Sequence, residues 1–214
     1  MGRGKHGKPA APAGPRRVKL KPRSTRTLDK MAPNELASVL RAVLTKHPEL
    51  RAEAEQIAIN MIATPSVEDV ADEVHDAVTS LGIESFHGRA GKQAWGYVEP
   101  SEAAWELLGE SVEYILTDMK RRADLGLHNA AEAMCCGMVL GLYRAREANS
   151  GGPLGWAPDF PAEEACEAVD ELIRASAAQD RGAARKRLLA ALRELVPSWD
   201  EMITRAADRA MKGR

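Results

Sequence analysis

The chain has 214 residues, of which 44% are hydrophobic, so it can bury a substantial core without metal ions or disulfides. Its three cysteines are an odd number without zinc-type spacing, which excludes a disulfide-stabilised secreted scaffold and favours buried thiols in a reducing compartment. The formal net charge of -1 hides an asymmetry, because residues 1–30 contain ten lysines and arginines against the single acid Asp29.

Residues 1–30 are expected to form a disordered basic tail, because they combine glycine, proline and cations with few apolar groups. These cations could neutralise the phosphates of RNA or DNA, contact another anionic partner such as a protein or a membrane surface, or serve only solubility. The tail contains no aromatic side chain for base stacking, so any nucleic-acid binding would be non-specific. The residues proposed for this contact are Arg3, Lys5, Lys8, Arg16, Arg17, Lys19, Lys21, Arg23 and Arg26.

Residues 31–214 are expected to form one helical domain, because apolar residues recur there at helical spacing. Proline followed closely by acids is typical of helix starts, since proline loses nothing at the first helical position and acids meet the positive end of the helix dipole. This pattern occurs at Pro48, Pro65, Pro100, Pro161 and Pro197. It predicts about eight helices and no strand, at 34–46, 48–63, 66–81, 101–125, 128–148, 161–178, 181–196 and 198–211.

The segment 128–148 differs from the other predicted helices because it is apolar on all sides between Ala133 and Tyr143. Such a helix is expected at the centre of a domain, surrounded by others. Gly137 and Gly141 lie one turn apart on it, where a neighbouring backbone could approach closely. The apolar run is far shorter than the roughly 20 residues that span a membrane, so we expect a cytoplasmic protein.

Two longer connections, residues 82–99 and 149–160, are the places where function is expected on a helical scaffold. In the second connection, Trp156 and Phe160 are expected to be buried. One hypothesis is a small ligand or partner pocket; the alternative is a structural corner in which Trp156 covers the core and the following helix is capped there. The residues of the proposed pocket or interface are Tyr143, Arg144, Arg146, Trp156 and Asp159.

The sequence contains no nucleophile elbow, zinc-protease motif or phosphate-binding motif, so no catalytic residue and no cofactor are predicted. Cys136 should point about 100° away from Cys135 around a helix, which makes joint metal coordination awkward and favours buried thiols. No metal site is therefore predicted among His128, Cys135, Cys136 and Cys166.

A second basic element lies at Arg181, Arg185, Lys186, Arg187 and Arg193. The preceding predicted helix is acidic, with Glu163, Glu164, Glu167, Asp170 and Glu171. We favour ion pairing between these two helices over a nucleic-acid-binding surface.

Three segments resemble an uncharacterised group of bacterial helical proteins: Glu99–Leu108, Gly141–Arg144 and Leu154–Pro161. The likeness covers about residues 36–175. It implies a bacterial origin and an autonomous helical domain, and it carries over no activity.

Together these patterns predict an all-α fold, an irregular multi-helix bundle, with a short HEAT-like or TPR-like solenoid as the alternative. The function expected is a non-enzymatic helical protein-interaction module, its protein partner unknown, with a basic tail for nucleic acid or another anion. The alternative is an enzyme or small-molecule sensor with its pocket near Tyr143, Trp156 and Asp159. An exposed apolar surface would favour the module, and a concave apolar pocket with a desolvated acid would favour the sensor.

Overall fold

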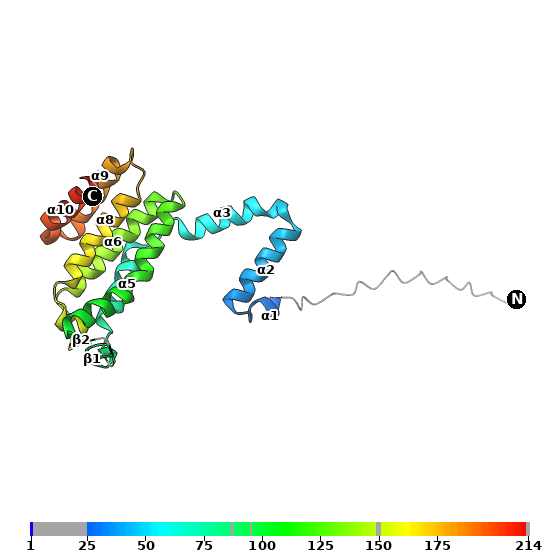
Figure 1. Cartoon of the computed structure of the whole chain (residues 1–214). Coiled ribbons are helices and arrows are strands. Elements are labelled where there is room, and N and C mark those ends of the chain that lie inside the picture. Colours follow the sequence, from blue (N-terminus) through cyan, green and yellow to red (C-terminus); the bar gives the residue numbers. More distant parts are fainter. Residues whose placement is uncertain (2–24, 87, 95, 149–150, 213–214) are drawn as a thin grey trace. The chain divides into compact units, whose positions relative to one another are not determined.

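Figure 1 shows the computed structural model of the chain, which describes Met1 and residues 25–86, 88–94, 96–148 and 151–212. Contacts within the chain separate it into two units, Met1–Ala54 and Glu55–Arg214. The proposed tail contacts from Arg3 to Arg23 lie outside the described residues, and Arg26 is placed only by its backbone in the single turn α1 (Thr25–Leu28). The division into a tail over 1–30 and one helical domain over 31–214 stays a prediction.

The first unit contains α2 (Pro33–Lys46), the 3-10 turn η1 (Pro48–Leu50) and the start of α3 (Arg51–Ile62). Helix α2 begins where predicted because Pro33 occupies its first position and the Glu35 carboxylate accepts a hydrogen bond from the Ala32 amide at 2.8 Å. At its other end the His47 amide donates to the Val43 carbonyl, also at 2.8 Å. No residue of α2 is buried.

The second unit is a bundle of helices. Its elements are α4 (Val67–Thr79), η2 (Ile83–Phe86), β1 (Gly91–Gln93), β2 (Gly96–Val98), α5 (Pro100–Asp124), α6 (His128–Ala145), α7 (Pro153–Trp156), α8 (Phe160–Ala175), α9 (Arg181–Leu195), η3 (Pro197–Trp199) and α10 (Asp200–Lys212). The all-α prediction is confirmed, and each of the eight predicted helices ends within about three residues of its expected bounds.

The prediction of no strand is wrong, because β1 and β2 form a short antiparallel hairpin within the connection 82–99. Gly91 pairs with Val98, and Gln93 pairs with Gly96. Each strand has three residues, which is too short for an alternating hydrophobic pattern to show in the sequence. Gly91 adopts a φ of 92°, a left-handed conformation that favours glycine at the start of the hairpin.

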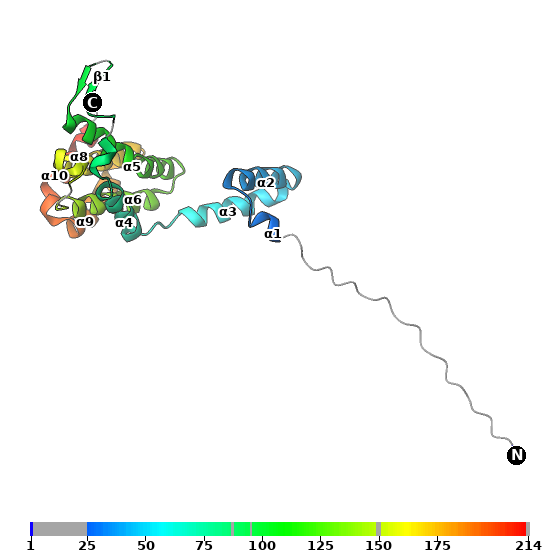
Figure 2. The ribbon, with the colours of Figure 1, turned by 90° about the horizontal axis from the view of Figure 1, so that it is seen from below.

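Helix α6 lies at the centre of the second unit, as predicted. Helices α4, α5, α8 and α9 all pack against it (Figure 2). Its buried residues run from Ala130 to Ala145 and occupy every side of the helix. A solenoid would place each helix pair only against its sequence neighbours, so this arrangement around one helix identifies a bundle.

The most extensive helix contact in the bundle joins α4 to α6, where the two predicted glycines lie. A Cβ atom at Gly137 would stand 2.6 Å from the Val70 Cβ, and one at Gly141 would stand 2.5 Å from the Ala71 carbonyl oxygen. Real Cβ atoms do not approach other atoms so closely. The prediction that these glycines admit a neighbouring backbone is therefore confirmed.

Candidate functional site

An exposed apolar stripe runs along α2. Leu36, Leu40 and Val43 follow one another at intervals of four and three residues, so they share one face of the helix. Their exposed fractions are 40%, 53% and 39%. Val39 and Leu44 flank them and are only partly buried. We call these five residues the α2 stripe; an apolar row of this kind left in solvent is typical of an interaction surface.

The opposite face of α2 is polar. The Ser38 hydroxyl donates to the Asn34 carbonyl at 2.9 Å, and the Thr45 hydroxyl donates to the Arg41 carbonyl at 2.8 Å. Because the helix is capped and polar on one side only, the stripe on its other side is held in a fixed geometry.

Helix α3 also exposes large apolar residues, but in a different pattern. Ile57, Ile59 and Met61 are all exposed and lie two residues apart. Ile57 and Met61 are four residues apart and share one face of the helix, whereas Ile59 lies about 200° around the helix from each of them. Helix α2 therefore has three large exposed apolar residues in one row, and α3 has two.

The residues predicted to form a pocket separate in the structure. Tyr143 and Arg146 lie together, since the guanidinium carbon of Arg146 stands 3.6 Å from the centre of the Tyr143 ring. The Tyr143 hydroxyl is also 2.8 Å from the Ser198 hydroxyl. Arg144 points elsewhere and forms ion pairs with Glu68 at 2.7 Å and Asp72 at 3.0 Å.

The predicted burial of Trp156 is wrong, whereas that of Phe160 is confirmed. Trp156 is 51% exposed, and Phe160 is fully buried. In the single turn α7, Leu154 faces the core, and a side chain two residues further along a helix points about 200° away. Asp159 occupies the position before α8 but makes no side-chain capping hydrogen bond. No described contact joins Trp156 or Asp159 to Tyr143.

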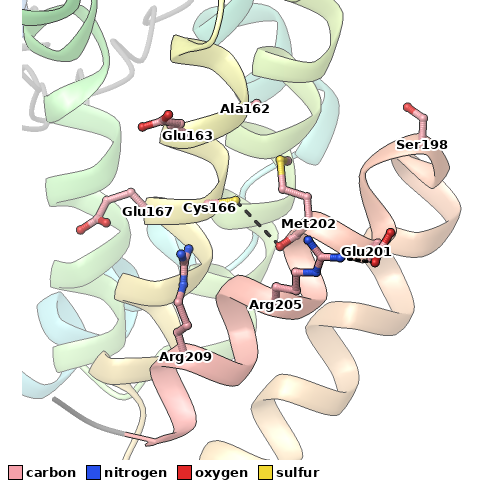
Figure 3. A pocket seen from close by; sticks show the side chains of 9 residues that line it. All are labelled: Ala162, Glu163, Cys166, Glu167, Ser198, Glu201, Met202, Arg205 and Arg209. Carbon is pink, nitrogen blue, oxygen red and sulfur yellow. Dashed lines mark hydrogen bonds and ion pairs between the residues drawn. The ribbon is translucent and has the colours of Figure 1, made fainter.

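A groove that the sequence did not predict lies between α8 and α10 (Figure 3). It has a volume of about 630 Å³. Glu163 and Glu167 project from α8, whereas α10 contributes Arg205 and Arg209 together with Glu201, which pairs with Arg205. The lining residues are Ala162, Glu163, Cys166, Glu167, Ser198, Glu201, Met202, Arg205 and Arg209. The sequence signals this groove only by two acids four residues apart and two arginines four residues apart. The same spacing is common on helix faces, so it does not predict a groove.

Helix α8 holds a desolvated acid, Glu164, outside the lining of that groove. Burial raises the pKa of this carboxyl to about 7, and the charge of Glu167 adds to the effect. The pKa of Glu164 is higher in the folded state than its ordinary value of 4.5. Its contribution to stability is therefore fully present below about pH 4.5 and is lost as the pH rises to about 7.

The Glu164→Gln variant is therefore expected to be more stable than the wild type at pH 8, by up to about 3 kcal/mol, and to show no such gain at pH 4. Urea denaturation at both pH values measures the difference. Glu163→Gln, at an exposed neighbour, provides the control. An equal effect of Glu164→Gln at the two pH values would contradict the assignment.

The basic residues of α9 form ion pairs within the chain, but the described pairs do not involve the acids of α8, contrary to the prediction; Arg181 instead donates to the backbone carbonyl of Arg174 in α8 at 3.1 Å. Arg185 pairs with Asp208 of α10 at 2.6 Å, and Arg187 pairs with Glu132 of α6. The acids of α8 have other partners: Glu171 bonds to Lys120 of α5 at 3.0 Å. The expectation failed because charge alone does not tell which helix lies beside α9.

The cysteines of α6 are buried, as predicted. Burial raises the pKa of Cys136 to about 12 and that of Cys135 as well, so both stay protonated thiols at neutral pH. Cys166 is only partly buried. Across the described ranges, no three side chains of the metal-binding types gather in one place.

No protein-family model, curated protein or solved structure matches this chain. None of the helices in the described part of the chain is both long enough and apolar enough to cross a bilayer. Its function is therefore inferred from the surfaces above.

Proposed function

We propose that this chain is a non-enzymatic protein-interaction module that binds a helical partner through the α2 stripe. The observation that carries this proposal is that α2 is an amphipathic helix none of whose residues is buried. Helical partners are recognised by apolar anchors spaced three and four residues apart, and Leu36, Leu40 and Val43 have this spacing.

Covering the half-exposed side chains of the stripe would stabilise a complex by part of the value for full burial. Covering apolar surface yields about 25 cal/mol for each Å², and full burial of a leucine or valine side chain is worth about 1.5–3 kcal/mol. Part of this gain is offset by the lost freedom of the two partners. Since α2 is already helical, a partner does not have to order it, which favours association.

The alternative function, a small-molecule sensor, has less support. Its proposed pocket requires Tyr143, Trp156 and Asp159 to converge, and Trp156 instead faces solvent. The groove between α8 and α10 is lined more by polar than by apolar surface. Ligand pockets are mostly apolar with a few placed polar groups.

Affinity purification from nuclease-treated lysate tests the proposal. The wild type is expected to retain a protein partner, and Leu40→Glu is expected to lose it, because a buried charge opposes apolar contact. Ser38→Glu adds the same charge on the polar face of α2 and is expected to retain the partner. Equal recovery with Leu40→Glu would contradict the role of the stripe.

The tail is proposed to contact anionic partners without sequence preference. Residues 1–30 contain ten lysines and arginines against one acid, whereas residues 31–214 carry a net charge of -10. The cations of the tail support the proposal because lysine and arginine neutralise phosphates without reading the base sequence. Binding of the chain to a short RNA or DNA duplex is expected to fall roughly 10³-fold or more between 50 and 200 mM salt.

Replacing the nine proposed tail cations with glutamine, which keeps the length of the tail, is expected to abolish this binding. Fluorescence anisotropy measures it. Binding that persists in the glutamine variant would place the nucleic-acid contact outside the tail.

A further inference from the structure

We infer that the partner of the α2 stripe is the α2 stripe of a second copy of this chain, with the two helices antiparallel. This inference rests on the function proposed above and identifies the occupant of its surface. It is carried by the apolar spacing along α2 and by the positions of two charges beside the stripe.

The apolar spacing is that of a helix-pairing seam. Leu36, Leu40 and Val43 alternate intervals of four and three residues, which is the pattern that brings two helices together along their length. Leu36 lies four residues before Leu40 and Val43 lies three residues after it, so the row is nearly symmetric about Leu40. In an antiparallel pair with a two-fold axis at Leu40, Leu40 of one copy lies beside Leu40 of the other, and Leu36 lies within one residue of the level of Val43.

The charges beside the stripe favour the antiparallel direction. Glu35 and Lys46 are eleven residues apart, which is about three helical turns, so they lie on the same flank of α2 at opposite ends. When Leu40 is at the centre of an antiparallel pair, Glu35 of each copy comes opposite Lys46 of the other. A parallel pair would keep these two charges at opposite ends of the interface.

Both charged groups are available for such a contact. One oxygen of Glu35, Oε2, accepts the hydrogen bond from the Ala32 amide, which leaves Oε1 free. Lys46 takes part in no ion pair with another described residue. Antiparallel helices also bring the positive end of each helix dipole beside the negative end of the other.

The interface is small, which sets its strength. A helix of 14 residues is about 21 Å long, and a pair of that length buries less than the roughly 1,200 Å² of a stable interface. The dimer is therefore expected to exchange with monomer at micromolar concentrations rather than to be permanent.

Sedimentation equilibrium of the full chain, from about 1 μM to 500 μM, tests the dimer. The wild type is expected to pass from monomer to dimer over this range. Leu40→Glu is expected to raise the dissociation constant at least 100-fold, and Ser38→Glu is expected to leave it within about twofold. A wild type that stays monomeric, or a dimer that Leu40→Glu does not weaken, overturns the inference.

Two charge variants, each compared with the wild type, test the direction of the pair. Glu35→Lys and Lys46→Glu each place like charges opposite one another, so each is expected to weaken its own homodimer about tenfold. In an equimolar mixture the two variants are expected to form a heterodimer tighter than either homodimer, because every facing pair is then opposite in charge. A parallel pair of the wild type would already place Glu35 beside Glu35 and Lys46 beside Lys46, so neither charge reversal would weaken it. Homodimers of both variants that are as tight as the wild type therefore overturn the antiparallel arrangement.

The result separates this inference from the function on which it rests. A monomeric wild type that still captures another protein through Leu40 overturns the second copy as partner and leaves the interaction module standing. If the Leu40→Glu variant keeps both the dimer and the captured protein, the second copy as partner and the interaction module are both overturned.

Discussion

Alanine at Gly141 is expected to lower the free energy of unfolding by up to about 2 kcal/mol. The added Cβ would stand 2.5 Å from the Ala71 carbonyl oxygen, which belongs to the backbone of α4 and cannot turn aside as a side chain could. Overpacking of this kind costs about 1–3 kcal/mol, and it exceeds the gain in helix propensity of about 1 kcal/mol from replacing glycine. Urea denaturation followed by circular dichroism measures the change.

Gly109→Ala provides the matched control, because it is the same substitution within helix α5. A Cβ atom at Gly109 would meet no atom within 4 Å, so only the propensity effect remains. This variant is expected to be more stable than the wild type by up to about 1 kcal/mol. If both alanines stabilise the protein, α4 and α6 do not approach each other as described.

Truncation of Phe160 to alanine is expected to lower the free energy of unfolding by about 3–5 kcal/mol. Phe160 is fully buried and makes an edge-to-face contact with Trp105, with ring centres 5.3 Å apart. Phe160→Ala leaves a cavity and removes that aromatic contact together. Thermal or urea unfolding of the variant measures the loss.

Trp156→Ala provides the comparison. Trp156 lies four residues before Phe160 and has a larger ring, but that side chain is half exposed. Its expected cost is below about 1 kcal/mol. A loss equal to that of Phe160→Ala would show that Trp156 covers the core after all, as the sequence had suggested.

Helix ends were predictable because their causes are local. The Ser66 hydroxyl accepts a hydrogen bond from the Asp69 amide at 3.2 Å, and Pro100 opens α5, as proline and acid patterns indicated. The role of Gly137 and Gly141 was also predictable, since an apolar helix with small residues one turn apart requires a close neighbour. In each case residues within one or two turns of each other decide the structure.

Features that depend on which helices are neighbours could not be predicted. Arg187 pairs with Glu132, 55 residues earlier in the chain, and the groove of Cys166 and Arg209 joins two helices of distant sequence. The sequence showed an amphipathic pattern in α2 but could not show which surface its apolar face contacts. Amphipathicity predicts that a face will be buried, and only the surrounding structure tells by what.

The close contact of α4 with α6 has a further consequence for recognising distant relatives of this chain. Positions 137 and 141 admit no side chain larger than hydrogen without moving α4. Any chain built on the same packing must therefore keep glycine twice, four residues apart, inside a fully apolar helix. An earlier helix must carry aliphatic residues where Val70 and Val74 meet those glycines. This paired pattern, more than overall identity, is the trace that divergence would leave intact.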